Sequence, residues 1–102
     1  MEKDEKKRLR EKVLSDCRPD TVFWICNDSI IRNIYELANS IEGMNEGTFM
    51  YHVNDDHQKN DFAKWINEVL CDQELAKKLE KIRDKMEYLK VIRKRIQELE
   101  SE

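Results

Sequence analysis

Residues 44–72, MNEGTFMYHVNDDHQKNDFAKWINEVLCD, contain the pattern that most constrains the fold. In their second half, five apolar residues recur at i, i+3, i+4, i+7 and i+8, the spacing of one helical face. These residues are Phe62, Trp65, Ile66, Val69 and Leu70. The spacing predicts an amphipathic helix over about 61–71, with Asn60 or Asp61 as its N-cap.

The first half of the stretch predicts a shorter helix over about 46–53, with Asn45 as its N-cap. The residues on one side of this helix are Phe49, His52 and Val53. The polar sequence NDDHQK, residues 54–59, is predicted to be the loop that joins the two helices. The stretch as a whole therefore predicts a helix–loop–helix that holds both histidines of the chain.

A third helix is predicted upstream, over about 29–42. Its apolar residues follow the spacing i, i+4, i+7, i+8 and i+11. They are Ile30, Ile34, Leu37, Ala38 and Ile41. Residues 27–29, Asn-Asp-Ser, supply candidate N-caps, and Gly43 stands where a left-handed residue commonly ends a helix.

The preceding residues 21–26, TVFWIC, have the composition of a strand. No second apolar run is evident for them to pair with, and a lone strand leaves its backbone unsatisfied. We therefore predict an extended segment anchored by Phe23 and Trp24. A charged first helix is predicted over 3–15, ended by the turn around Pro19.

The C-terminal residues 73–99 predict a long helix that follows Asp72 as its cap. Its first apolar residues are spaced 4, 3, 4 and 3, as in a short heptad seam. They are Leu75, Leu79, Ile82, Met86 and Leu89, after which Ile92, Ile96 and Leu99 continue with a shifted phase. A continuous helix would be ~40 Å long, more than so small a domain can cover. A break near 83–90 or a contact with a second subunit is therefore favoured.

Composition supports this helical interpretation. Of the 102 residues, 40% are charged, and there are only two glycines and one proline. Many charges and few turn-forming residues indicate helices with solvated faces. We predict a single all-α domain over residues 1–102: a small orthogonal bundle of about five helices with a long C-terminal helix or helical hairpin. Its body is expected at about 21–82, with an amphipathic tail at 83–99.

The charge is distributed unevenly, although the net charge is only −3. Residues 21–72 hold three basic and nine acidic side chains, whereas residues 1–20 and 73–102 are mildly basic. An acidic body suits a protein partner with a basic patch better than it suits nucleic acid, which prefers a clearly basic face.

The sequence also predicts where the protein is found. No apolar run approaches the ~18 residues that span a membrane, and the N-terminal MEKDEKKRLREK lacks the apolar core of a signal peptide. Cys17, Cys26 and Cys71 are odd in number and widely spaced, as expected for reduced thiols. We therefore expect a cytoplasmic protein without membrane contact.

Several short motifs lie between residues 23 and 76. They are Phe23-Trp24, Cys26-Asn27, Ile34-Tyr35-Glu36-Leu37, Phe49, HVN at 52–54, NDFA-x-W at 60–65, Asp72 and Leu75-Ala76. Through these motifs the chain resembles a family of small uncharacterised helical domains from archaea and bacteria, a domain of unknown function. HVN and NDFA-x-W are the most specific. The resemblance implies a compact helical domain and implies no activity.

Residues able to do chemistry are few. His52 with Asp61 or Asp56 is the strongest acid–base candidate, but no nucleophile stands at a recognisable spacing. His57 and the neighbouring carboxylates could bind a metal, yet the loop lacks the spacing of a calcium hand, and the cysteines are not paired as in zinc sites. We therefore predict no catalytic residue, no cofactor and no metal.

Several of these residues also have a structural interpretation. His52 can be a partly buried histidine whose ring nitrogen bonds a loop carbonyl or a cap. Trp65 lies on the apolar face of its helix, where core packing is expected. Asn54, Asn60 and Asp61 can act as helix caps, the usual role of asparagine and aspartate at such positions.

Protein interaction is the function that the sequence favours. The candidate partner-binding residues are Trp24, His52, Asn54, His57 and Asp61. A homodimer through the C-terminal helix would use Met86, Leu89, Ile92, Ile96 and Leu99. The alternatives are nucleic-acid binding, through the helix–loop–helix or the basic cluster at 90–95, and, less favoured, an enzyme that uses His52 with Asp61.

Overall fold

The computed structural model describes residues 2–25, 29–54 and 59–101, with the backbone alone for residues 2–6. Its α-helices are α1 (Glu2–Leu14), α2 (Ile34–Gly43), α3 (Glu46–His52), α4 (Asp61–Trp65), α5 (Gln73–Leu79) and α6 (Lys85–Glu100). Two further turns are the 3-10 turn η1 (Pro19–Thr21) and the π-helical turn η2 (Ile66–Leu70). Two antiparallel ladders pair β1 (Phe23–Trp24) with β2 (Ile30–Ile31) and β3 (Val53–Asn54) with β4 (Lys59–Asn60). The protein is mainly helical, and the all-α prediction holds only in this coarser form.

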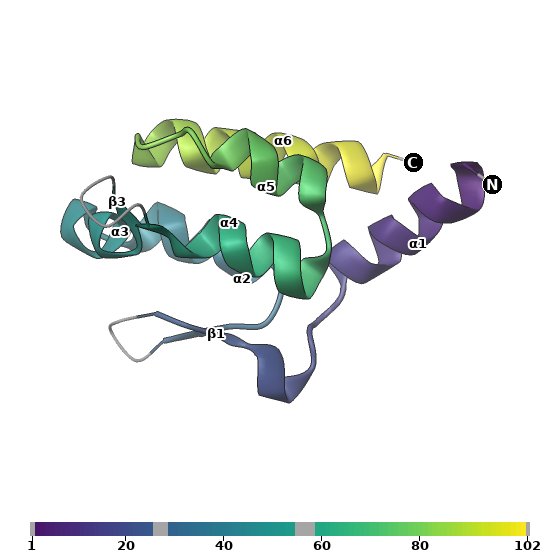
Figure 1. Ribbon diagram of the computed structural model, residues 1–102, viewed down its shortest axis with the longest axis horizontal. Coiled ribbons are helices and arrows are strands. Elements are labelled where there is room, and N and C mark those ends of the chain that lie inside the picture. The colour runs from purple at the N-terminus through teal and green to yellow at the C-terminus, as the bar shows by residue number, and fades with distance from the viewer. Residues whose placement is uncertain (1, 26–28, 55–58, 102) are drawn as a thin grey trace.

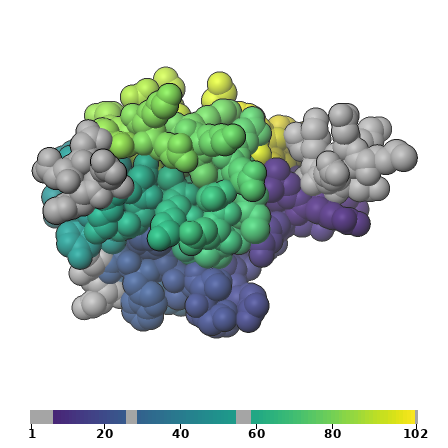
Figure 2. All heavy atoms as spheres, viewed as in Figure 1, coloured from purple at the N-terminus to yellow at the C-terminus, as the bar shows by residue number. Residues whose placement is uncertain are grey.

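The helices form two layers, as Figure 1 shows. α5 and α6 run side by side over α4 and α2, and the β1–β2 hairpin lies on the other side of α4 and α2. α1 leaves the body at one end, where it contacts α2 and α6. Figure 2 shows that side chains close the space between α4 and α5 on the face toward the viewer. Within the described residues, no helix combines the length and the apolar character needed to cross a membrane.

An asparagine or aspartate side chain begins each helix from α2 to α6. In every case its oxygen accepts a hydrogen bond from the backbone N–H three residues later, which otherwise has no partner in the helix. The capping residues are Asn33, Asn45, Asn60, Asp72 and Asp84. The predicted caps Asn45, Asn60 and Asp72 are thus confirmed.

Aromatic rings fill the centre of the core. Phe49, Phe62 and Tyr88 are fully buried, and the centroid of the Tyr88 ring lies 5.3 Å from that of Phe49. The Tyr88 hydroxyl donates to Oδ1 of Asn60 at 2.6 Å, and Nδ2 of Asn60 donates to the carbonyl of Leu79. Burial raises the pKa of Tyr88 far above its usual value, so the hydroxyl stays a donor. One asparagine therefore ties α4, α5 and α6 together.

The β1–β2 hairpin corrects the prediction that residues 21–26 have no strand to pair with. Phe23 pairs with Ile31, and Trp24 pairs with Ile30. The spacing from Ile30 to Ile34 also fits a helical face, so the pattern alone predicts a helix for the two isoleucines. As the strand β2, their backbone forms the hydrogen-bonded ladder that β1 requires, and Ile31 is completely buried.

The predicted helix over 29–42 is therefore wrong in its first turn. α2 begins at Ile34 behind the cap Asn33, and residues 27–28 of the predicted cap lie outside the described residues. At its other end, Gly43 remains helical and has no positive φ. The extended backbone of Met44 ends the helix instead. The predicted left-handed glycine is thus a further correction.

The C-terminal segment is broken and folds back as a helical hairpin, one of the two predicted outcomes. The break lies at residues 80–84, at the N-terminal edge of the predicted range 83–90. Asp84 caps the new helix and so sets a new helical phase. In that phase Tyr88 enters the core, whereas Met86, a predicted seam residue, stays 64% exposed.

The end of the 61–71 helix departs from α-helical geometry. Its second half is the π-helical turn η2, and Cys71 follows with φ 63° and ψ 26°. Cys71 is the non-glycine residue with positive φ in the described part of the chain. The left-handed conformation crowds Cβ of an L-residue and costs about 1–2 kcal/mol.

Cys71→Gly is expected to raise the free energy of unfolding by about 0.5–1 kcal/mol, because relief of this strain exceeds the entropy gained by the unfolded chain. The Cys71 side chain is exposed, so little packing is lost. Urea denaturation measures the change. Cys71→Ala keeps the Cβ and is the matched control: it should not stabilise, and equal gains for both variants would contradict the explanation.

Candidate functional site

His52 and Asp61 form a hydrogen-bonded pair in which the imidazole is buried and the carboxylate is partly exposed. His52 ends α3 and Asp61 begins α4, and the pairing of Val53 with Asn60 between them brings the two side chains together. Nδ1 of His52 lies 2.9 Å from Oδ2 of Asp61. Because an ionised carboxylate only accepts, the proton of this bond belongs to Nδ1. The two groups are thus within hydrogen-bond reach, as the sequence hypothesis that pairs them requires.

The surroundings of the pair are those of a core. His52 is 4% exposed. Its ring centroid lies 5.3 Å from that of Phe23, 5.2 Å from that of Phe62 and 5.0 Å from that of Tyr51. These rings hold the imidazole edge-on or tilted, in the geometry of packed aromatic pairs. His52 therefore lies in the core, more deeply buried than its structural interpretation expected.

Lys59 contacts the His52–Asp61 pair on the side that faces solvent. Its ammonium lies 3.4 Å from Oδ2 of Asp61 and 4.2 Å from the centroid of the Tyr51 ring. The Asp61 side chain, about a third exposed, is thus shared between an imidazole and a cation. These contacts fix the start of α4 against the end of α3.

Of the predicted loop 54–59, the structure describes Asn54 and Lys59 but not residues 55–58. The Asn54 side chain donates to the carbonyls of Met50 and Tyr51, so it satisfies the end of α3. This is the capping role that its structural interpretation expected. His57, together with Asp55 and Asp56, lies outside the described residues.

The two tryptophans have opposite environments. Trp65 is 6% exposed, and its indole N–H donates to the carbonyl of Thr21 at 2.8 Å. Trp24 is 66% exposed. Because side chains alternate along a strand, Phe23 points to the core and Trp24 points outward on the same hairpin. Of the predicted partner-binding residues that the structure describes, Trp24 is the one that presents most of its side chain to solvent.

The cysteines form no metal centre in the part of the chain that the structure covers. Cys17 and Cys71 are free thiols, and Cys26 lies outside the described residues. Among residues 2–25, 29–54 and 59–101, no three or more His, Cys, Asp or Glu side chains are placed to hold a metal ion.

Four of the five predicted self-association residues are buried within the chain itself. Leu89, Ile92, Ile96 and Leu99 are each at most 8% exposed, and only Met86 of this set is accessible. They face α2 and α5 as part of the core. Their apolar character is therefore explained without a second subunit.

A buried ion pair that sequence reasoning missed joins the start of α5 to α6. Asp72 is fully buried and receives hydrogen bonds from Nε and Nη2 of Arg95, at 2.8 and 3.0 Å. Burial alone lowers the pKa of Arg95, but its hydrogen bonds and the charges of Asp72, Glu74 and Glu98 raise it overall. The sequence contains a signal for the burial of Arg95, because Tyr88, Ile92 and Arg95 follow one another at the 4 and 3 spacing of the buried face.

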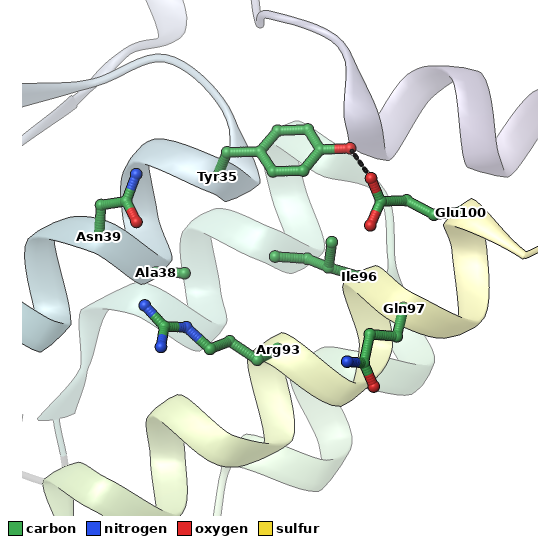
Figure 3. Close-up of a pocket in the computed structure, with 7 residues that line it drawn as sticks. All are labelled: Tyr35, Ala38, Asn39, Arg93, Ile96, Gln97 and Glu100. Atoms are coloured by element: carbon green, nitrogen blue, oxygen red, sulfur yellow. Dashed lines mark hydrogen bonds between the residues drawn. The ribbon is translucent and has the colours of Figure 1, made fainter.

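A hollow of about 260 Å³ lies between α2 and α6. Figure 3 shows its lining, with Arg93 reaching from α6 toward Ala38 and the Tyr35 ring lying across toward Glu100. The Tyr35 hydroxyl donates to Oε2 of Glu100 at 3.1 Å, and Arg93 pairs with Glu42 at the other end of α2. Partial burial and the Glu100 hydrogen bond raise the pKa of Tyr35.

Comparison with known proteins places most of the chain in one family model. Residues 18–101 match a model described as a family of unknown function (DUF5752). The match includes the region of the resemblance, residues 23–76, and extends it to the end of α6, whereas α1 lies outside it. No curated protein and no solved structure matches the chain.

Proposed function

The chain belongs to the DUF5752 family, whose function is unknown, and from this premise we propose that it is a non-catalytic protein-interaction module. The observation that carries the proposal is the exposed Trp24. Tryptophan is the residue type most enriched at interaction hot spots, where its large rigid ring is desolvated by the partner. Here it stands on the outer face of a hairpin whose inner face, through Phe23 and Ile31, belongs to the core.

The hairpin suits a contact surface because it is anchored firmly. The Phe23 ring packs on Phe62 and Trp65, with centroids 5.1 and 6.1 Å away. The ladder to β2 then fixes the backbone of Trp24 itself. A tryptophan held on a rigid support loses little conformational entropy on binding, which favours affinity.

The surroundings of His52 favour a module without catalysis. An acid–base group must reach the proton that it transfers, directly or through one water. His52 is almost completely buried among aromatic rings, and its partner Asp61 is engaged by Lys59. These contacts explain the pair as a structural element, and this supports protein binding over the less favoured enzyme alternative.

The basic cluster at 90–95 gives little support to nucleic-acid binding. Arg95 is buried against Asp72, and Arg93 is paired with Glu42. Among the described residues, Lys90 and Lys94 are the two basic side chains of the cluster that are exposed and form no ion pair. Two lysines are fewer than the clearly basic face that phosphate recognition requires.

Trp24→Ala is expected to abolish most partner binding and to leave folding intact. Loss of a hot-spot tryptophan costs about 2 kcal/mol or more of binding free energy, about 30-fold in affinity. Stability should change by less than about 0.5 kcal/mol, because the side chain is exposed. The measurement is affinity capture from nuclease-treated native lysate with the wild type and with the variant, quantified by mass spectrometry.

Met50→Ala is the matched control, because Met50 is also an exposed apolar residue, at 42%, but lies on α3. It should capture the same proteins as the wild type. Capture that is equal for wild type and Trp24→Ala would contradict the proposed site. Loss of all bound material on nuclease treatment would favour the nucleic-acid alternative.

A further inference from the structure

The backbone of the β1–β2 hairpin alternates between residues that bond across the ladder and residues whose polar groups face outward. The N–H of Ile25 donates to the carbonyl of Ser29 at 2.8 Å, so Ile25 and Ser29 are a hydrogen-bonded pair. In an antiparallel ladder such pairs alternate with pairs that exchange no hydrogen bond. The next pair, Trp24 with Ile30, is therefore of the second kind. The backbone N–H and carbonyl of Trp24 consequently point away from β2.

The β2 side of the hairpin is covered by the chain itself. Arg32 follows β2 directly, and its outward carbonyl accepts a hydrogen bond from the N–H of Cys17 at 2.7 Å. The N–H of Arg32 donates to the Glu36 carboxylate at 2.8 Å. Cys17 thus lies where a further strand would pair along the β2 side. The open edge of this hairpin is therefore the outer side of β1, which we call the β1 edge.

The β1 edge offers a backbone donor and acceptor beside an exposed aromatic side chain. Within the residues that the structure describes, the outward N–H and carbonyl of Trp24 have no hydrogen-bond partner. The hairpin lies at the margin of the molecule, on the side away from α5 and α6 (Figure 1). Unpaired backbone groups on an edge strand are a template for pairing with another extended chain. Trp24 therefore presents its backbone and its 66% exposed side chain at one place.

We infer that the β1 edge binds an extended segment of a partner protein, which adds to the hairpin as an antiparallel third strand. This inference rests on the proposed function and names the form of the partner. One residue of the segment exchanges two hydrogen bonds with the backbone of Trp24. Its side chain then lies beside the indole on the outer face, in one row with Trp24 and Ile30. Because aromatic and β-branched residues pair well across strands, we expect Val, Ile or Thr at this position of the partner.

The shortness of β1 favours a single extended segment over a second copy of the chain. The strand has two residues, Phe23 and Trp24. Stable contacts between two folded proteins bury about 1,200–2,000 Å², far more than so short an edge provides. Strand addition instead takes its affinity from main-chain hydrogen bonds and its specificity from alternate side chains. The β1 edge supplies both, through the backbone and the side chain of Trp24.

The test uses the full chain and a peptide selected on it from a library of short random peptides. Intermolecular NOEs to the ¹⁵N-labelled protein identify the peptide residue that lies opposite Trp24. N-methylation of that residue removes the N–H that faces β1 and should weaken binding about tenfold or more. N-methylation of either neighbouring residue is the matched control. Their N–H groups face away from β1, so affinity should change by less than about twofold.

Trp24→Ala distinguishes the backbone contact from the contact of the indole. The variant keeps the N–H and carbonyl of residue 24 but lacks the ring, and by the proposed function it should bind the peptide about 30-fold more weakly. If Trp24→Ala weakens binding but the three N-methylated peptides bind equally, the inference fails and the proposed function stands. If Trp24→Ala binds as the wild type does and the N-methylation pattern is present, the proposed function fails and strand addition stands.

Amide exchange of Trp24 completes the test. Its N–H should exchange at least about tenfold more slowly in the peptide complex than in the free chain, because it gains a hydrogen bond. Two further results would overturn the inference. One is a selection that yields no peptide whose binding shifts the hairpin amides. The other is sedimentation of the free chain as a dimer in which the Trp24 amide is already protected, because a second copy would then occupy the β1 edge.

Discussion

Asp72→Ala is expected to lower the free energy of unfolding by about 4 kcal/mol, the largest loss that we predict for a single charged residue. Asp72 combines two roles. Its Oδ1 caps α5 by accepting from the N–H of Leu75, and both carboxylate oxygens accept from Arg95. Alanine removes the cap and leaves the guanidinium of Arg95, a residue that is 8% exposed, without its main counter-charge. Most of the loss is the cost of that unpaired buried charge.

Chemical denaturation measures this loss, and two further variants identify its cause. Glu74→Ala removes another carboxylate that contacts Arg95, at 3.2 Å, but Glu74 is 61% exposed and should contribute less than about 1 kcal/mol. Asp72→Ala combined with Arg95→Met removes the buried charge and should recover part of the stability. A loss below about 1 kcal/mol for Asp72→Ala would contradict this account.

Phe62→Ala is expected to cost a similar amount, about 4 kcal/mol, because it empties the centre of the aromatic core. The Phe62 ring is fully buried. Its centroid lies 5.1 Å from that of Phe23, 5.2 Å from His52, 6.1 Å from Tyr88 and 6.3 Å from Phe49. The four rings come from β1, α3 and α6, so they cannot all close on the cavity that alanine leaves.

Thermal and urea unfolding measure the effect of Phe62→Ala. Phe62→Leu retains most of the volume and should lose about 1–2 kcal/mol. Tyr51→Ala removes another ring that contacts His52, but Tyr51 is 56% exposed, so a smaller loss than for Phe62→Ala is expected. If Phe62→Ala were as stable as Phe62→Leu, the core would not be organised around this ring.

Local signals in the sequence were sufficient to predict much of the helical structure. The apolar pattern from Phe62 to Leu70 marks one buried face, although the backbone changes from α to π geometry within it. Asn45, Asn60 and Asp72 cap helices as predicted, because an N-cap acts within three residues.

Segments whose sequence fits two different local structures were harder to predict. Ile30 fits a helical face by spacing, and only its pairing with Trp24 shows that it is in a strand. The break before α6 did have a local signal, since Asp84 and Glu87 have the spacing of a capping box. The heptad-like spacing through Met86 outweighed this signal, because a continuous helix accounts for the same apolar spacing.

The candidate sites could be predicted only in part, for a related reason. The sequence suggests the pairing of His52 with Asp61, and the two side chains lie within hydrogen-bond distance. The burial of His52, which decides the role of the pair, is a tertiary property. The burial of Arg95 likewise follows from its approach to Asp72, 23 residues earlier. The hollow between α2 and α6 is lined by helices far apart in the sequence, so no single motif predicts it.

Amide hydrogen exchange on the captured complex tests the central claim, that partner binding uses the outer face of the β1–β2 hairpin. Exchange is compared between the free chain and the chain bound to a partner captured through Trp24. The account predicts added protection at residues 23–24 and 30–31 and no change at His52 or Asp61. Unchanged exchange in the hairpin, with new protection over residues 52–61, would contradict it and return the interaction to the helix–loop–helix.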